Sequence, residues 1–440
     1  MALPMKTDKT PFMSGARVEM LSALDCSSYY ELLLALSKNA SVLSHHTNSL
    51  AGMTSAQQKI EGDRANGRAL AMLLHCIPPT LMRSIVAGTV AHDFLDRSTP
   101  SPDVYSADGA GTYVAGIAIQ GRDDGFLTYP ELSDLVAALE DYCKSYKLQK
   151  RRGGQPPTNP SEILADTIAR QIDDEFGGRV PSKPDSHRWI PNDDALRRVE
   201  LFVASLKDRL ASIDRDGLSR TTIHIQSPLM VGCSKLLRDR MPHHTGADGS
   251  SLRSTTYTWG LTLCCIQACL QLTPRPVVQP VVHVWRNEHL PISEVLVTAL
   301  AGSYCFQDGF NVIGAGTSSG VASMQTLLDS KHYMFCQEPY FKANAAATTK
   351  ELEKRAEYIA DIWLCADFYD AALKREIQDL ETQIEQTKVK GYLWEELVKK
   401  VARKEEGLRA ESDRLATEIK AKRARLKIYD FLLDKKRPSE

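Results

Sequence analysis

The sequence has a net charge of only −1 and lacks a secretory leader and a long hydrophobic run. Its 440 residues carry 54 Lys+Arg and 55 Asp+Glu. The overall charge therefore favours neither nucleic acid nor a membrane surface, although a neutral total is compatible with a local basic face. The N-terminal segment contains no apolar core of about 7–15 residues, and no run of about 18 apolar residues occurs. We expect an intracellular protein, nuclear or cytoplasmic, that has no membrane partner.

Cysteine pairs with the spacing of a metal site are also absent. The ten cysteines are scattered, and no two of them are separated by two residues. Cys264, Cys265 and Cys269 lie in an apolar segment whose only polar side chain is Gln267. Buried reduced thiols are a simpler interpretation of this segment than a zinc site. Reduced thiols are typical of an intracellular, reducing compartment.

The composition is that of a globular protein with more than one folded region. Hydrophobic residues make up 43% and charged residues 25% of the chain, which excludes wholesale disorder. We expect a mostly helical N-terminal region, a basic Gly/Pro-rich linker, a helical connector, a mixed α/β domain and a coiled coil. Their predicted bounds are residues 1–149, 150–160, 161–216, 217–345 and 346–437.

Local patterns predict several elements in the first half of the chain. Tyr113–Ile119 is rich in β-branched and apolar residues, which indicates a strand. Thr128 and Glu131 have the spacing of a capping box and predict a helix that runs to about Tyr146. Apolar residues at helical spacing predict another helix over Asp193–Ile213.

The C-terminal region has the composition and periodicity of a coiled coil. Residues 351–440 contain 20 Lys+Arg and 20 Asp+Glu. Apolar residues recur at heptad intervals from Leu352 to Leu433, and Gly391 separates two arms of similar length. The pattern is compatible with an antiparallel hairpin and with two long continuous helices in a parallel dimer. We therefore expect a homo-oligomer or a coiled-coil partner.

The residues with the strongest chemical pattern follow two predicted short strands, Thr221–Ile225 and Leu229–Gly232. At offsets of two, five, eight and twelve residues after Gly232 come Ser234, Leu237, Arg240 and His244. Glu294 later begins a predicted helix, and Asn311 follows it.

This constellation resembles the GIY-YIG nuclease family over roughly residues 217–320. In that family the second signature, Tyr-(Ile/Val)-Gly, is followed at these offsets by Ser or Thr, Leu, Arg and often His, and later by Glu and Asn. Both signature tyrosines depart from the pattern. Met230 replaces the second, and no Gly-x-Tyr lies near Thr221. Gly111-Thr-Tyr113 has the right letters but lies over a hundred residues upstream, and we do not assign it to the site.

The resemblance implies a helix-rich α+β fold in which a small antiparallel sheet is flanked by helices. It also implies roles for the matching residues. Arg240 would bind the scissile phosphate, Glu294 would hold Mg²⁺ or Mn²⁺, and Asn311 would support the scaffold or contact the nucleic acid.

Phosphodiester hydrolysis also needs a base for the attacking water, and a histidine is suited to that task. The candidates are His243 and His244 after Arg240, together with His224, which would stand in for the missing tyrosine. Lys235 and Arg238 lie beside Arg240 and are candidates for phosphate contacts.

Two functions are consistent with these residues. The first is a metal-dependent endonuclease that hydrolyses DNA or RNA. The second is a catalytically inactive GIY-YIG-like binding or scaffold protein that assembles through its coiled coil, which the missing tyrosines favour.

Overall fold

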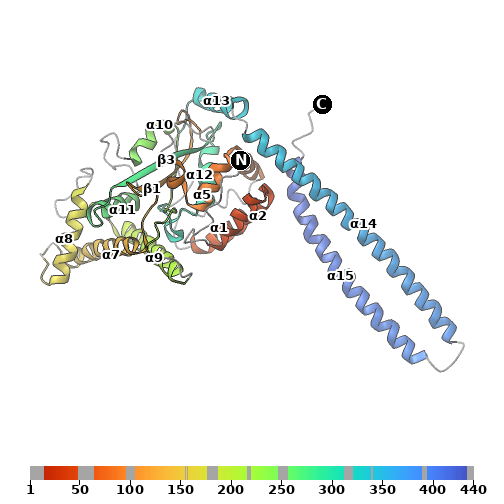
Figure 1. Cartoon of the computed structure of the whole chain (residues 1–440). Coiled ribbons are helices and arrows are strands. Elements are labelled where there is room, and N and C mark those ends of the chain that lie inside the picture. The colour runs from red at the N-terminus through yellow and green to blue at the C-terminus, as the bar shows by residue number, and fades with distance from the viewer. Residues whose placement is uncertain are drawn as a thin grey trace. The chain divides into compact units, whose positions relative to one another are not determined.

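The chain forms two compact units, Met1–Asn344 and Ala345–Glu440 (Figure 1). In the computed structural model the described residues are 14–47, 64–95, 105–153, 155, 157–175, 187–215, 220–245, 256–311, 321–337, 340–388 and 394–433. The described helices outside the second unit are α1 (Gly15–Asp25), α2 (Tyr29–Thr47), α4 (Arg64–Cys76), α5 (Pro79–Ala87), α6 (Val90–Phe94), α7 (Tyr129–Arg152), α8 (Pro160–Asp174), α9 (Asp193–Arg215), α10 (Leu237–Arg240), α11 (Tyr257–Ala268), α12 (His289–Ala301) and α13 (Met324–His332).

A three-stranded antiparallel sheet organises the first unit. Its strands are β1 (Gly111–Ile119), β2 (Met230–Ser234) and β3 (Pro274–His283), and the order β2-β1-β3 puts β1 at the centre. Tyr113 of β1 lies opposite Gly232 of β2. The prediction of a helix-rich fold with a small antiparallel sheet is therefore confirmed.

Helices cover both faces of this sheet. Val114 and Ala118 of β1 belong to a core shared with α1, α2, α4, α5 and α12. Ala115 and Ile117 belong to a second core shared with α7, α8, α9 and α11. Because β1 is buried on both faces, its sequence is a continuous apolar run and not an alternation.

The locally predicted elements are present, but α7 continues past the predicted end at Tyr146 to Arg152, into the predicted linker. The predicted strand at Tyr113–Ile119 is β1, which begins two residues earlier. The capping box is formed at the start of α7, with Thr128 and Glu131 each bonding the other's backbone. The helix predicted from Asp193 is α9.

Of the two short strands predicted next to the site, the second corresponds to β2 and the first is wrong. Thr221–Ile225 forms no strand, because its backbone bonds a different segment: the His224 carbonyl accepts from Phe126 N at 2.7 Å, and His224 N donates to Leu127 O at 3.3 Å. The partner of β2 is β1. The predicted separation of residues 1–149 from 217–345 is corrected as well, because β1 lies within one sheet with β2 and β3.

Two further predictions concern the cysteines near α11 and membrane-spanning helices. Cys264 and Cys265 are buried as expected, but Cys269 at the end of α11 is exposed. In the part of the chain that the structure describes, no single helix is long and apolar enough to cross a membrane. One pair bent by 103°, Asn66–Cys76 with Pro79–Ala87, passes by length and composition, and its leucines Leu73, Leu74 and Leu81 are 0% exposed within the core.

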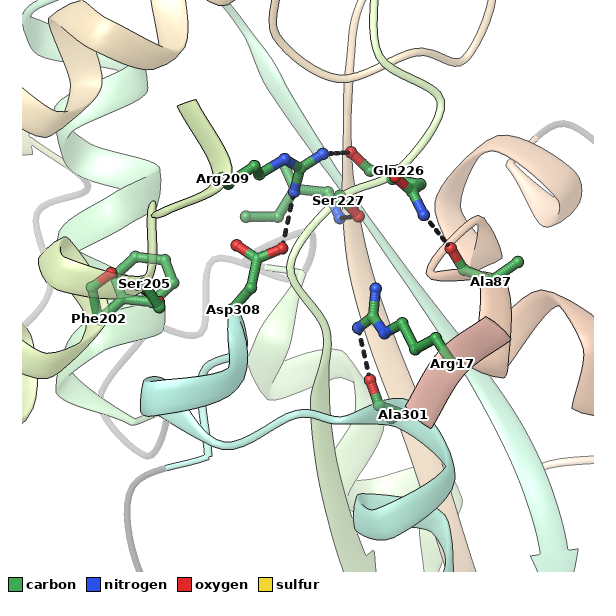
Figure 2. A network of polar contacts seen from close by, with 10 residues as sticks. Arg17, Ala87, Phe202, Ser205, Arg209, Gln226, Ser227, Ala301 and Asp308 are labelled. Carbon is green, nitrogen blue, oxygen red and sulfur yellow. Dashed lines mark hydrogen bonds and ion pairs between the residues drawn. The ribbon is translucent and has the colours of Figure 1, made fainter. Parts of the chain in front are cut away.

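A buried charge cluster ties distant segments of the first unit together (Figure 2). Arg209 of α9 donates to Asp308 at 3.0 Å and to the Gln226 carbonyl at 2.7 Å. Arg17 of α1 donates to the Ala301 carbonyl at 2.8 Å. Arg209 and Asp308 are 1% and 2% exposed. A charge so far from water is tolerated only when it is paired, so these contacts fix the packing of α1, α9 and the end of α12.

The second unit contains two long helices, α14 (Tyr340–Lys388) and α15 (Trp394–Leu433). Lys404 pairs with Glu376, and the Arg423 guanidinium lies 4.3 Å from the Trp363 ring centroid. The later residue of α14 thus pairs with the earlier residue of α15, so the two helices are antiparallel (Figure 1). This is the first of the two arrangements left open by the sequence; coiled-coil packing of the seam remains a prediction.

Candidate functional site

Tyr113 lies at the centre of a polar cluster on the β2 edge of the sheet. Its ring crosses the backbone of Gly232 on the neighbouring strand, and a Cβ atom at Gly232 would overlap with the Tyr113 hydroxyl. Only glycine leaves room for this ring. The glycine of the second signature is thus required by the tyrosine on the adjacent strand.

His244 is hydrogen-bonded to Tyr113. Its Nε2 lies 2.7 Å from the Tyr113 hydroxyl oxygen. His244 is 1% exposed, and Trp259 Nε1 donates to its carbonyl at 3.3 Å, which holds the turn after α10 in place. Burial, with the charges of Arg240 and His243 acting in the same direction, lowers the pKa of His244 to about 3. The His244 ring is therefore neutral near pH 7.

Arg240 approaches the same hydroxyl from the end of α10. Two backbone bonds anchor this short helix, from Leu237 N to Gly109 O and from Arg238 N to Ala107 O, each 2.9 Å long. Burial raises the pKa of Tyr113 to about 12, while the charge of Arg240 and its hydrogen bond to the phenol act to lower that pKa. Arg240 is half-buried, so its guanidinium remains partly accessible to a phosphate.

Glu294 reaches the cluster from α12. A hydrogen bond of 2.6 Å between the Thr112 and Ser293 hydroxyls fixes this helix against β1. The Cys233 thiol of β2 donates to Glu294 Oε2 at 3.3 Å. The Glu294 charge raises the pKa of Tyr113, so the carboxylate and the Arg240 guanidinium act on the same phenol. Both Arg240 and Glu294 are thus close enough to Tyr113 for their charges to affect its pKa, and a direct contact between them stays a prediction.

Asn311 holds the backbone of β2 in place. Its Oδ1 accepts from Val231 N at 2.7 Å, and its Nδ2 donates to Val231 O at 2.6 Å. The side chain is 7% exposed. Its prediction as a nucleic-acid contact is corrected, because both ends of the amide already hold the backbone of β2; the alternative scaffold role agrees with the geometry.

His224 lies elsewhere. Its backbone bonds Phe126 and Leu127, next to the Ile119 end of β1. Tyr113 is six residues away along that strand, which corresponds to about 20 Å. Burial and the Arg209 charge lower the pKa of His224 to about 3. The prediction that His224 replaces the signature tyrosine is therefore wrong; its ring belongs to the surroundings of the Arg209 cluster.

The remaining basic candidates lie on the segment that follows β2. Lys235 is exposed and His243 is half-buried. Arg238 is exposed and forms an ion pair with Asp108. Exposed pairs of this kind contribute little free energy, so Arg238 can exchange Asp108 for a phosphate at small cost.

A divalent ion would have to bind here through one carboxylate. The described residues contain no group of three or more His, Cys, Asp and Glu side chains placed to hold a metal. Mg²⁺ commonly keeps most of its waters and binds through one or two carboxylates and the phosphates of the substrate. Glu294 is half-buried and fits this requirement.

Sequence reasoning missed two residues of the cluster, Tyr113 and Cys233. The letters Gly111-Thr-Tyr113 were a visible signal for the first, since they match the missing first signature. Cys233 had no signal, because its proximity to Glu294 depends on how α12 packs on the sheet.

Comparisons with protein-family models, curated proteins and solved structures found no match for the chain. The resemblance to GIY-YIG nucleases rests on the residues of this sequence alone.

Five buried histidines make stability sensitive to acid. Burial lowers the pKa of His75 and His283. It is also the main cause that lowers the pKa of three others, His187 to about 4 and His224 and His244 to about 3. In the unfolded chain these histidines bind a proton near pH 6.5, whereas in the folded chain they stay neutral to a lower pH. Their contribution to the free energy of unfolding is therefore present above pH 6.5 and is lost as the pH falls toward the folded-state pKa values. Asp173, whose pKa burial raises to about 6, acts in the opposite sense over this range. We expect the free energy of unfolding to fall by on the order of 4 kcal/mol between pH 7 and pH 5.

Urea denaturation at the two pH values measures this change. An equal free energy of unfolding at pH 7 and pH 5 would contradict the assignment of neutral buried histidines.

Proposed function

We propose that the chain is a metal-dependent phosphodiesterase that cleaves DNA or RNA at a GIY-YIG-like site. One observation carries the proposal: beside Gly232, Tyr113 is hydrogen-bonded to His244 and Arg240, and the charge of Glu294, which comes from a third segment, acts on the same phenol. With Gly111 and Tyr113 on the strand next to β2, the first signature is supplied from a distant part of the chain.

Arg240 and Glu294 would bind the phosphate and the metal ion. A planar guanidinium binds two phosphate oxygens at once, which suits Arg240 to the scissile group. Glu294 would hold Mg²⁺ or Mn²⁺, which supplies positive charge at a phosphate oxygen and makes a bound water more acidic. Lys235 and Arg238 would bind neighbouring phosphates and position the chain of nucleotides.

Tyr113 would accept the proton, and His244 would orient its phenol. Tyr113 accepts a proton from the attacking water only after its phenol has lost its own. His244 Nε2 lies 2.7 Å away and would accept the hydrogen bond of this hydroxyl, which orients the phenol. Because burial lowers the pKa of His244 to about 3, its ring is too weak a base to take the proton, which would pass to solvent. The Arg240 charge favours the phenolate, which offsets part of the cost of burying it.

The second candidate is a protein that binds nucleic acid without cleaving it. Two observations favour it: Tyr113 is 2% exposed, and Met230, in the place of the second signature tyrosine, is 2% exposed and belongs to the core. In this alternative the sheet is a binding platform, and the two long helices are the assembly element.

Substitution of the carboxylate tests the first candidate. The Glu294→Gln variant is expected to lose at least about 100-fold of the Mg²⁺- or Mn²⁺-dependent cleavage rate of labelled DNA and RNA strands, because its side chain no longer carries the ligand charge. The exposed residue just before α12 offers a matched control, and Glu288→Gln should cleave like the wild type. Equal rates for Glu294→Gln and Glu288→Gln would contradict the role of Glu294.

A further inference from the structure

The helix α14 exposes a row of large apolar side chains. Leu364, Phe368 and Tyr369 are 76%, 73% and 65% exposed. Cys365 and Ala372 are exposed beside them. These five residues, called here the α14 stripe, recur at intervals of three and four and so share one helical face.

The stripe is separate from the seam that pairs α14 with α15. The seam residues Trp363, Ala366 and Leu373 are half-buried, and Trp363 contacts Arg423 of α15. The stripe therefore adds a second apolar face to a helix that already has a partner. Exposed apolar rows of this kind mark interaction surfaces.

We propose that the α14 stripe is the contact surface for a second copy of this chain, with the two α14 helices antiparallel about a two-fold axis at Phe368. In a two-fold contact both copies use the same patch. A residue that lies a given number of positions before Phe368 in one copy therefore faces the residue that lies the same number of positions after Phe368 in the other copy. Phe368 then faces its symmetry mate, and Leu364 faces Ala372.

The charges at the ends of the stripe fit this register. Asp361 lies seven residues before Phe368, and Arg375 lies seven residues after it. Both are exposed, and a spacing of seven keeps them on the face of the stripe. The axis at Phe368 puts Asp361 of each copy opposite Arg375 of the other, which gives two ion pairs of opposite charge.

The area is sufficient for a reversible dimer. The large side chains of the stripe would bury roughly 500 Å² on each copy and about 1,000 Å² in total, which is near the lower limit for a specific interface. Two helical hairpins joined in this way form a four-helix arrangement. The surface is independent of the proposed cleavage site.

Sedimentation of the full-length chain at micromolar concentration tests the proposal. The wild type should sediment as a species of twice 48.8 kDa. The Phe368→Glu variant puts two like charges at the axis and should raise the dissociation constant by about 100-fold or more. Leu328→Glu, at an exposed leucine of α13, is the matched control and should remain dimeric. Circular dichroism checks that helix content is unchanged, as the high exposure of Phe368 predicts.

A charge exchange tests the register. Asp361→Arg and Arg375→Asp should each weaken the dimer, because each puts like charges face to face, and the double variant should restore it. A monomeric wild type, a dimer insensitive to Phe368→Glu, or a double variant no tighter than the single ones would overturn the proposal.

Discussion

Tyr113→Phe is expected to lower kcat for phosphodiester cleavage by about 100-fold to 1,000-fold, the range typical of losing a positioned acid–base group. The variant keeps the ring that lies across Gly232 and removes only the hydroxyl that joins His244 Nε2 to the Arg240 side chain. Substrate binding should change little, because the phosphate is held by Arg240. The loss should therefore appear in kcat and not in KM.

Single-turnover cleavage of a labelled strand measures this effect. Tyr146→Phe is the matched control, since it removes a hydroxyl hydrogen bond to Asp193 on the surface of the same unit. A Tyr113→Phe variant that folds and cleaves at the wild-type rate would show that the phenol takes no part in proton transfer.

Asp308→Ala is expected to reduce the free energy of unfolding by about 3–5 kcal/mol, the range for removing one partner of a buried ion pair. The change leaves the Arg209 guanidinium 1% exposed without its carboxylate. Arg17 loses a favourable charge as well, since Asp308 opposes the effect of burial on its pKa. The backbone contributes too, because Asp308 has φ of 71°, which alanine adopts less readily.

Chemical denaturation with two controls separates these causes. Asp308→Asn keeps a residue suited to positive φ and removes only the charge, so it should be less destabilising than Asp308→Ala. Asp214→Ala breaks the exposed pair with Arg220 and should cost less than about 1 kcal/mol. If Asp308→Ala were no more destabilising than Asp214→Ala, the buried cluster would not fix the packing of α1 and α9.

Part of this fold could be predicted from interactions between residues that are close in the sequence. The strand β1 follows from a run of β-branched and apolar residues, and the start of α7 follows from the side chains of Thr128 and Glu131 bonding its first turn. Arg240 and His244 are predicted because their offsets from Gly232 resemble the GIY-YIG pattern. These features depend on neighbours within about a dozen residues.

The rest of the site depends on contacts between distant segments. The sequence next to β2 suggested a hairpin with Thr221–Ile225, but those residues bond Phe126 and Leu127. No local pattern distinguishes the two pairings, because the choice is set by the burial of β1 between two cores. The sequence therefore does not predict Tyr113 as a site residue, and its prediction of His224 is wrong.

The most direct test of the central claim is cleavage of a labelled oligonucleotide by the purified full-length chain with Mg²⁺ or Mn²⁺, measured for the wild type and Arg240→Ala side by side. We expect that the wild type cleaves and that Arg240→Ala, although folded, does not. Binding without cleavage by the wild type, or equal cleavage by both proteins, would contradict it.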